Sequence, residues 1–148
     1  EQLRLSGEER VRPLTATVLA TLADQNDAFR KLVRDAALYH DGRVACQWRG
    51  KLLNGQVTRT PGVAARFGNG DAMLSLLALV ASFADFTEAN DPLGEHNFGN
   101  IKLTVNGESV TVYWKFDYYD PTMEWGSDDP ADPALTFRLL TILCSDDY

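Results

Sequence analysis

The dipeptide Asn106-Gly107, set between two alternating runs, is the feature that most constrains how this chain can fold. Asn-Gly favours a two-residue type I′ turn, because both central residues of that turn need positive φ. Residues paired across such a turn have numbers that sum to 213, so Leu103 faces Val110 on one face of the hairpin. We therefore predict a β-hairpin over residues 100–118.

The two faces of this hairpin differ in polarity. Trp114, Phe116 and Tyr118 continue the apolar face. The opposite face carries Lys102, Thr104, Ser109, Thr111, Tyr113, Lys115 and Asp117. An antiparallel sheet that is covered on one side gives this pattern, so we expect Trp114 to be buried.

Three helices are predicted around the hairpin. Apolar residues recur at steps of three or four over residues 13–39, with one polar interruption at Gln25. Residues 71–85 are apolar nearly all round, which predicts a buried helix. Asp132-Pro133 has the residue types of an N-cap and a first helical position, which predicts a last helix over residues 133–145.

The remaining segments complete an α+β expectation. Residues 43–49 and 56–60 alternate and predict a second hairpin, with its turn within residues 51–55. The fold we expect is an antiparallel sheet of three to five strands with about three helices packed on one face, forming a single domain over residues 1–148. The most apolar segment, residues 72–84, is shorter than the roughly 20 residues of a membrane-spanning helix, so we expect no membrane association.

Charge is divided unevenly along the chain. Residues 1–84 hold 11 basic and 8 acidic side chains, whereas residues 85–148 hold 3 basic and 13 acidic ones. An acidic half repels phosphate, which argues against direct nucleic-acid binding through it. A basic surface of another protein is the expected partner instead. The alternative is that these acids only keep the protein soluble and cap helices.

A carboxylate and imidazole set is the best catalytic candidate. Glu95 and His96 lie in the loop before the hairpin, and Asp117 lies near its far end, so we name these three as candidate catalytic residues. With Asp91 and Asp120 they could form the site of a metal-dependent hydrolase. The structural alternative is that Asp91 forms an Asx-turn and His96 satisfies loop backbone groups. No familiar metal-ligand spacing occurs, and we predict no cofactor and no bound metal.

The acidic loops also hold candidate partner-binding residues. Tyr and Trp are preferred at interface cores, and Trp125 lies in an acidic stretch without a basic residue. The alternative is that Trp125 pins its loop to the domain. The predicted partner-binding residues are Glu88, Asp91, Asp120, Glu124, Trp125, Asp128 and Asp129.

Several motifs together resemble a known family. Residues 83–99 are FADFTEANDPLGEHNFG, residues 114–120 are WKFDYYD and residues 126–133 are GSDDPADP. In order and spacing they resemble a family of small alphaproteobacterial domains of unknown function, which often sit on plasmids and other mobile elements. The resemblance implies a genomic setting and no activity.

The expected function follows from the charge and the resemblance. We expect a cytoplasmic, non-enzymatic, acidic protein-interaction module, in its sharpest form a nucleic-acid-mimicking inhibitor of the anti-CRISPR or anti-restriction type. The alternative is the small metal-dependent hydrolase that would use Asp91, Glu95, His96, Asp117 and Asp120.

Overall fold

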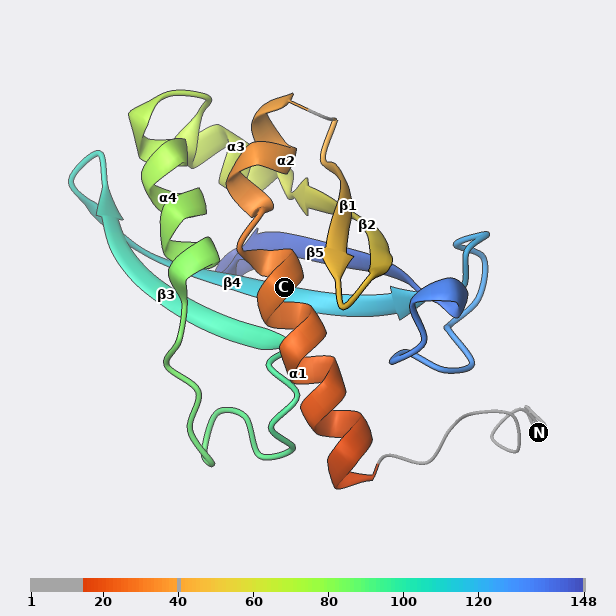
Figure 1. The fold of residues 1–148 in the computed structure, drawn as a ribbon. Coiled ribbons are helices and arrows are strands. Elements are labelled where there is room, and N and C mark those ends of the chain that lie inside the picture. Colours follow the sequence, from red (N-terminus) through yellow and green to blue (C-terminus); the bar gives the residue numbers. More distant parts are fainter. Residues whose placement is uncertain (1–14, 40, 148) are drawn as a thin grey trace.

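A five-stranded mixed sheet forms the centre of the protein in a computed structural model that describes residues 15–39 and 41–147 (Figure 1). The strand order is β1-β2-β5-β4-β3, and β2 and β5 are the only parallel neighbours among the described strands. The strands are β1 (Arg43–Trp48), β2 (Lys51–Arg59), β3 (Phe98–Val105), β4 (Glu108–Tyr119) and β5 (Phe137–Cys144). The predicted α+β class is confirmed.

The predicted hairpin is confirmed in its register. β3 and β4 pair antiparallel with Leu103 opposite Val110, and Asn106 and Gly107 have φ values of 51° and 78°. Trp114 is fully buried, as alternation from the turn requires. The β1–β2 hairpin is also present, but its turn is at Arg49–Gly50 and not within residues 51–55. Arg49 adopts the left-handed conformation there, which its sequence type does not signal.

The predicted C-terminal helix is wrong. Asp132 does cap a helical turn through Ala134, but this 3₁₀ turn (η2, Pro133–Leu135) ends at once, and β5 follows as the central strand of the sheet. Periodicity alone does not show whether a short apolar run is a buried helix or a buried strand, and helix-start signals before this run favoured the helix. Pairing with both β2 and β4 decides the outcome.

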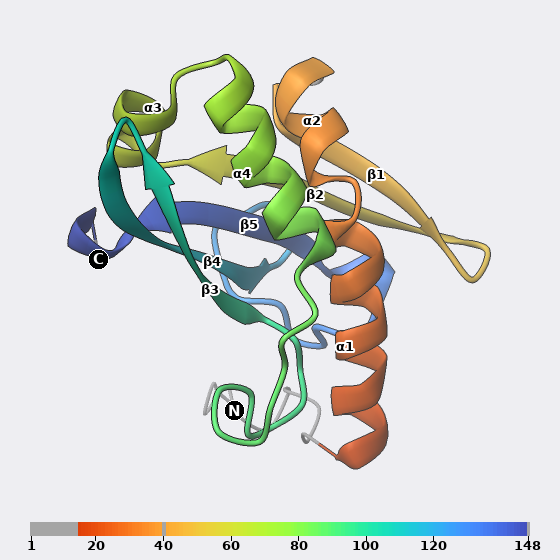
Figure 2. The ribbon, with the colours of Figure 1, turned by 90° about the vertical axis from the view of Figure 1, so that its left-hand side faces the viewer.

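The helices cover one face of the sheet (Figures 1 and 2). The predicted helix over residues 13–39 is two helices, α1 (Ala16–Arg30) and α2 (Val33–Tyr39); Pro13 lies outside the described residues. α3 (Pro61–Phe67) was not predicted, and α4 (Asp71–Ser82) ends three residues before the predicted boundary. No helix among the described residues is both long enough and apolar enough to cross a membrane.

The core lies between these helices and the sheet. Phe29 from α1, Leu76 and Leu77 from α4, and Trp114 and Leu140 from the sheet are all fully buried. Two loops extend from the elements that form this core. The 83–97 loop connects α4 to β3, and the acidic loop, residues 120–132, connects β4 to β5. These two loops carry most of the predicted site residues.

Candidate functional site

Asn26 is the centre of a buried polar network that attaches α1 to both β4 and β5. Its Oδ1 accepts a hydrogen bond from Arg138 Nε at 3.1 Å, and its Nδ2 donates to the Tyr118 hydroxyl at 2.8 Å. The same Nδ2 donates to the backbone oxygen of Glu95 at 3.1 Å. Asn26 is fully buried, so its amide group depends on these protein partners and not on water for its hydrogen bonds.

Glu95 is turned into this network and not toward solvent. The Tyr118 hydroxyl donates to Glu95 Oε2 at 2.5 Å, and Glu95 is only 9% exposed. Burial, reinforced by the Glu95 charge, raises the pKa of Tyr118 well above its usual value, so Tyr118 remains a proton donor. Glu95 therefore fastens the 83–97 loop to β4, a task that sequence alone did not assign to it.

Arg138 extends the network to the acidic loop. Its guanidinium is fully buried and donates to Gln25 Oε1 and to the Pro130 carbonyl, the latter at 3.2 Å. Gln25 Nε2 in turn donates to the Ala131 carbonyl at 2.8 Å. Burial lowers the pKa of Arg138 to about 10, which keeps it charged at neutral pH. Both loops are thus held by adjacent residues of α1.

His96 lies between two carboxylates. Its Nδ1 is 3.0 Å from both carboxylate oxygens of Asp27, and its Nε2 is 3.6 Å from Asp91 Oδ2. The ring stacks on Phe86 with centroids 3.8 Å apart and planes 4° apart. The Asp91 carboxylate also accepts hydrogen bonds from the backbone N–H groups of Glu95 and His96. Both ring nitrogens therefore face carboxylates of the protein itself, and not the loop backbone groups that the structural alternative named.

Asp27 connects His96 to a second buried arginine. Arg30 Nη2 donates to Asp27 Oδ1 at 2.7 Å, and Arg30 Nη1 donates to the carbonyl oxygens of Val80 and Ala81 at the end of α4. The Arg30 guanidinium also lies 4.9 Å from the Trp114 ring centroid. The 83–97 loop is therefore anchored at both of its ends to α1.

The five residues proposed for a hydrolase do not converge. Asp91 and His96 meet, and Glu95 turns to Tyr118. Asp117 alternates with the buried residues of β4, so it lies on the opposite face of the sheet, where it pairs with Lys115 at 3.2 Å. Asp120 lies in the acidic loop and accepts a hydrogen bond from the Thr122 hydroxyl at 2.7 Å.

Another group of potential metal ligands lies elsewhere, at the C-terminal end of β5. Among the described residues, Cys144, Asp146 and Asp147 bring ligand atoms within 4.8 Å of one another. Both carboxylates are already engaged: Asp147 accepts from the Thr60 hydroxyl at 2.6 Å, and Asp146 pairs with Arg66 at 2.8 Å. Burial raises the pKa of the Cys144 thiol. This group acts as a connection between β5 and α3.

The acidic loop is rigid at its base and carries a tryptophan in water. Asp120 N–H donates to the Trp125 carbonyl at 2.8 Å, Met123 N–H donates to the Asp120 carbonyl at 2.9 Å, and Tyr119 forms a bridge with Gly126. The Trp125 side chain is nonetheless 72% exposed. The sequence alternative, in which Trp125 pins the loop to the domain, is therefore wrong.

The predicted partner-binding residues differ in how available they are. Glu88, Glu124, Trp125 and Asp128 are exposed, and Asp120 and Asp129 are half-buried. The Asp91 side chain is only 7% exposed and serves the 83–97 loop internally. The sequence patterns did not indicate that Asn26, Asp27 and Arg138 are functional residues, and Gln25 stood out only as a polar interruption on an apolar helix face.

Lowering the pH should destabilise the acidic loop, because it protonates the Asp120 carboxylate. The Thr122 hydroxyl, helped by backbone N–H groups, lowers the pKa of Asp120 below its ordinary 3.8, so the folded loop favours the ionised carboxylate. Its stabilisation is fully present above pH 3.8 and is lost as pH falls through the lower folded value. We expect the hydrogen-exchange protection of the Asp120 and Met123 amides, measured by NMR, to stay constant until pH falls below 3.8 and then to decrease. In the matched variant Asp120→Asn this step should vanish; a step of the same size there would contradict the assignment.

A family model matches more than half of the chain. The model of the family described as protein of unknown function (DUF3768) matches residues 59–147, which include α3, α4 and strands β3 to β5. No curated protein and no solved structure matches the chain.

Proposed function

The chain belongs to the family described as protein of unknown function (DUF3768), and from its geometry we propose that it is a protein-binding module whose acidic loop recognises a basic surface of another protein. The observation that carries this proposal is Trp125, which is 72% exposed on a loop whose base is fixed by backbone hydrogen bonds. An exposed aromatic on a preorganised loop loses little conformational entropy on binding, and Trp is enriched among the residues that dominate interface energies.

The surroundings of Trp125 support a basic partner. The acidic loop contains Asp120, Glu124, Asp128, Asp129 and Asp132 and no basic residue. Met123, two residues from Trp125, is 37% exposed and offers a second apolar contact. Carboxylates around an aromatic anchor steer a positively charged partner and discriminate against acidic ones. Glu88 on the 83–97 loop adds exposed negative charge.

A sharper form of the proposal is nucleic-acid mimicry. Surfaces that bind nucleic acid are rich in Lys and Arg that contact phosphate, and closely spaced carboxylates present the same sign of charge to them. The resemblance of the chain's motifs to domains from mobile elements supports an inhibitor of host nucleic-acid enzymes, of the anti-CRISPR or anti-restriction type, acting in the cytoplasm. Duplex DNA should then compete with this chain for its partner. Simultaneous binding of both would contradict mimicry while leaving the basic-partner proposal intact.

The geometry favours binding over hydrolysis. The hydrolase proposed from sequence needs Asp117 and Asp120 beside His96, whereas Asp117 lies on the other face of the sheet and pairs with Lys115. Glu95 is committed to Tyr118. A general acid or base must reach a substrate, and the two nitrogens of His96 already face Asp27 and Asp91.

Replacing Trp125 should weaken partner binding without affecting folding. We expect Trp125→Ala to raise the Kd for the purified partner about 30-fold, because a buried tryptophan anchor contributes about 2 kcal/mol. The partner is first identified by affinity capture from the native host, and Kd is then measured by calorimetric titration. The free energy of unfolding should change by less than about 0.5 kcal/mol.

Leu79 provides the matched control for this measurement. It is a large apolar side chain that is 43% exposed on α4, outside both loops. Leu79→Ala should leave Kd unchanged within about twofold, since it truncates exposed apolar area away from the acidic loop. Equal losses in both variants, or an unchanged Kd in Trp125→Ala, would reject the acidic loop as the binding surface.

A further inference from the structure

β1 is an edge strand whose outward N–H groups are unoccupied among the described residues, while the outward carbonyl of Gln47 accepts a hydrogen bond from the Cys46 thiol at 3.5 Å. Val57 N–H donates to the Gly42 carbonyl at 2.6 Å, and the register alternates from there, so Val44 and Cys46 exchange hydrogen bonds with β2. The backbone groups of Arg43, Ala45 and Gln47 therefore point away from β2. Within residues 15–39 and 41–147, no hydrogen bond occupies the N–H groups of these three residues.

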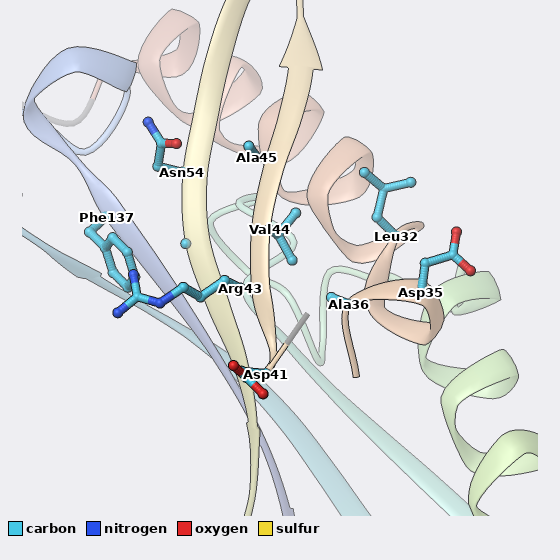
Figure 3. Close-up of a pocket in the computed structure, with 10 residues that line it drawn as sticks. Leu32, Asp35, Ala36, Asp41, Arg43, Val44, Ala45, Asn54 and Phe137 are labelled. Atoms are coloured by element: carbon cyan, nitrogen blue, oxygen red, sulfur yellow. The ribbon is translucent and has the colours of Figure 1, made fainter. Parts of the chain in front are cut away.

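An open groove of about 840 Å³ runs beside this edge (Figure 3). Leu32, Asp35 and Ala36 line it from the α2 side, and Asn54 and Phe137 line it from the neighbouring strands. Figure 3 shows β1 between these two groups of side chains. An extended chain laid along β1 would therefore find side-chain contacts on both faces of the sheet, as alternating residues of a strand require.

The groove carries unpaired charge of predominantly negative sign. Asp35 and Asp41 are exposed, and neither side chain has an ion pair or hydrogen bond to another described residue. Arg43 is the one cation among the lining residues. Two carboxylates against one guanidinium favour a segment that is itself basic.

We propose that the β1 edge binds an extended basic segment of a partner protein, which joins the sheet as a sixth strand. Its backbone would pair with the outward groups of Arg43, Ala45 and Gln47, which supplies affinity without sequence preference. Its basic side chains would reach Asp35 and Asp41, and its alternate side chains would lie beside the exposed side chains of Arg43 and Ala45. This site goes beyond the function proposed for the acidic loop and does not depend on it.

The opposite edge of the sheet differs and supplies a control. In β3 the residues that face outward are Asn100, Lys102 and Thr104, because Val105 and Glu108 flank the two-residue turn and exchange hydrogen bonds. Lys102 stands exposed in the middle of this edge, a usual device against strand addition. A basic segment should therefore avoid β3.

The test uses a capped synthetic peptide of alternating lysine and valine, with the ¹⁵N-labelled full chain, and follows amide hydrogen exchange by NMR. We expect saturating peptide to slow exchange at Arg43 and Ala45 by about tenfold or more, since a new interstrand bond protects each N–H. A peptide with methyl groups on alternate backbone nitrogens should not slow it. Equal protection by the methylated peptide, or protection centred on the acidic loop, would overturn the proposal.

Two matched proline variants make the test specific to the edge. Ala45→Pro removes an outward N–H that makes no bond to β2, so the fold should persist while the peptide effect is lost. Thr104→Pro makes the same change on β3 and should keep the peptide effect. The double variant Asp35→Lys and Asp41→Lys, which leaves the strand backbone unchanged, should also abolish binding. A concentration-dependent dimer that Ala45→Pro disperses would overturn the proposal in favour of a second copy of this chain.

Discussion

Replacing Asn26 by alanine is expected to lower the free energy of unfolding by about 3 kcal/mol, measured by urea denaturation. Asn26 accepts from Arg138 Nε and donates to the Tyr118 hydroxyl; Asn26 and Arg138 are fully buried, and Tyr118 is half-buried. No carboxylate contacts the Arg138 guanidinium, so amide and carbonyl oxygens are its acceptors among the described residues. Losing Asn26 leaves the buried Nε–H of this charged group without an acceptor, which costs more than the bond itself contributes.

A double-mutant cycle distinguishes this network from simple loss of packing. Arg138→Met should cost less in the Asn26→Ala background than in the wild type, with a coupling of about 1 to 2 kcal/mol, because the arginine has then already lost an acceptor. Asn69→Ala, in the exposed turn before α4, should change stability by less than about 0.5 kcal/mol. Additive effects of the Asn26 and Arg138 substitutions would contradict the network.

Gly99→Ala is the second large effect, with an expected loss of about 3 kcal/mol or failure to fold. Gly99 pairs with Trp114 across β3 and β4, and a Cβ at Gly99 would come within 2.1 Å of the Trp114 indole nitrogen. The indole cannot retreat, because Phe83 packs against its ring at 5.4 Å and the Arg30 guanidinium lies at 4.9 Å. The added methyl therefore displaces either the strand or the core.

Gly126 is the matched control for Gly99. A Cβ there meets only the Tyr118 carbonyl oxygen, at 3.9 Å, which is ordinary contact. Gly126→Ala should thus change the free energy of unfolding by less than about 0.5 kcal/mol in the same denaturation experiment. If both glycine variants lose similar amounts of unfolding free energy, the contact with Trp114 is not the cause of the destabilisation in Gly99→Ala.

Local chemistry explains which parts of the fold were predictable. The β3–β4 register follows from Asn106-Gly107 alone, since the turn type fixes every pair that follows. The β5 segment carries no such signal: FRLLTILC is apolar on both sides because β5 lies at the centre of the sheet. Its identity as a strand depends on β2 and β4, which are distant in sequence.

The site was less predictable for the same reason. Asn26 and Arg138 are 112 residues apart, and their contact exists only after β5 has entered the sheet. A polar residue on an apolar helix face, such as Gln25, and an arginine within an apolar strand were the signals available. Gln25 alone, or Arg138 alone, is only a polar residue in an apolar segment. The fold shows that the two side chains are hydrogen-bond partners.

The buried network around Asn26 and Arg138 also holds the acidic loop in position. Gln25 and Arg138 hold the Pro130 and Ala131 carbonyl oxygens, and Asn26 holds the 83–97 loop through the Glu95 carbonyl oxygen. Buried polar groups that hydrogen-bond to one another restrict the geometry of the segments they join, and here one Arg138 nitrogen, Nη1, stays without a partner among the described residues. We infer that this fixed geometry is what allows Trp125 to stay exposed on an ordered loop.

The salt dependence of partner binding is the most direct test of the proposal that an acidic surface binds a basic partner. Kd for the purified partner should rise at least about tenfold between about 50 mM and about 500 mM salt, because exposed charges are screened within a few ångströms at the higher concentration. Combined Glu124→Gln and Asp128→Asn should flatten this dependence. A Kd that stays constant over the range, with tight binding retained, would contradict the account.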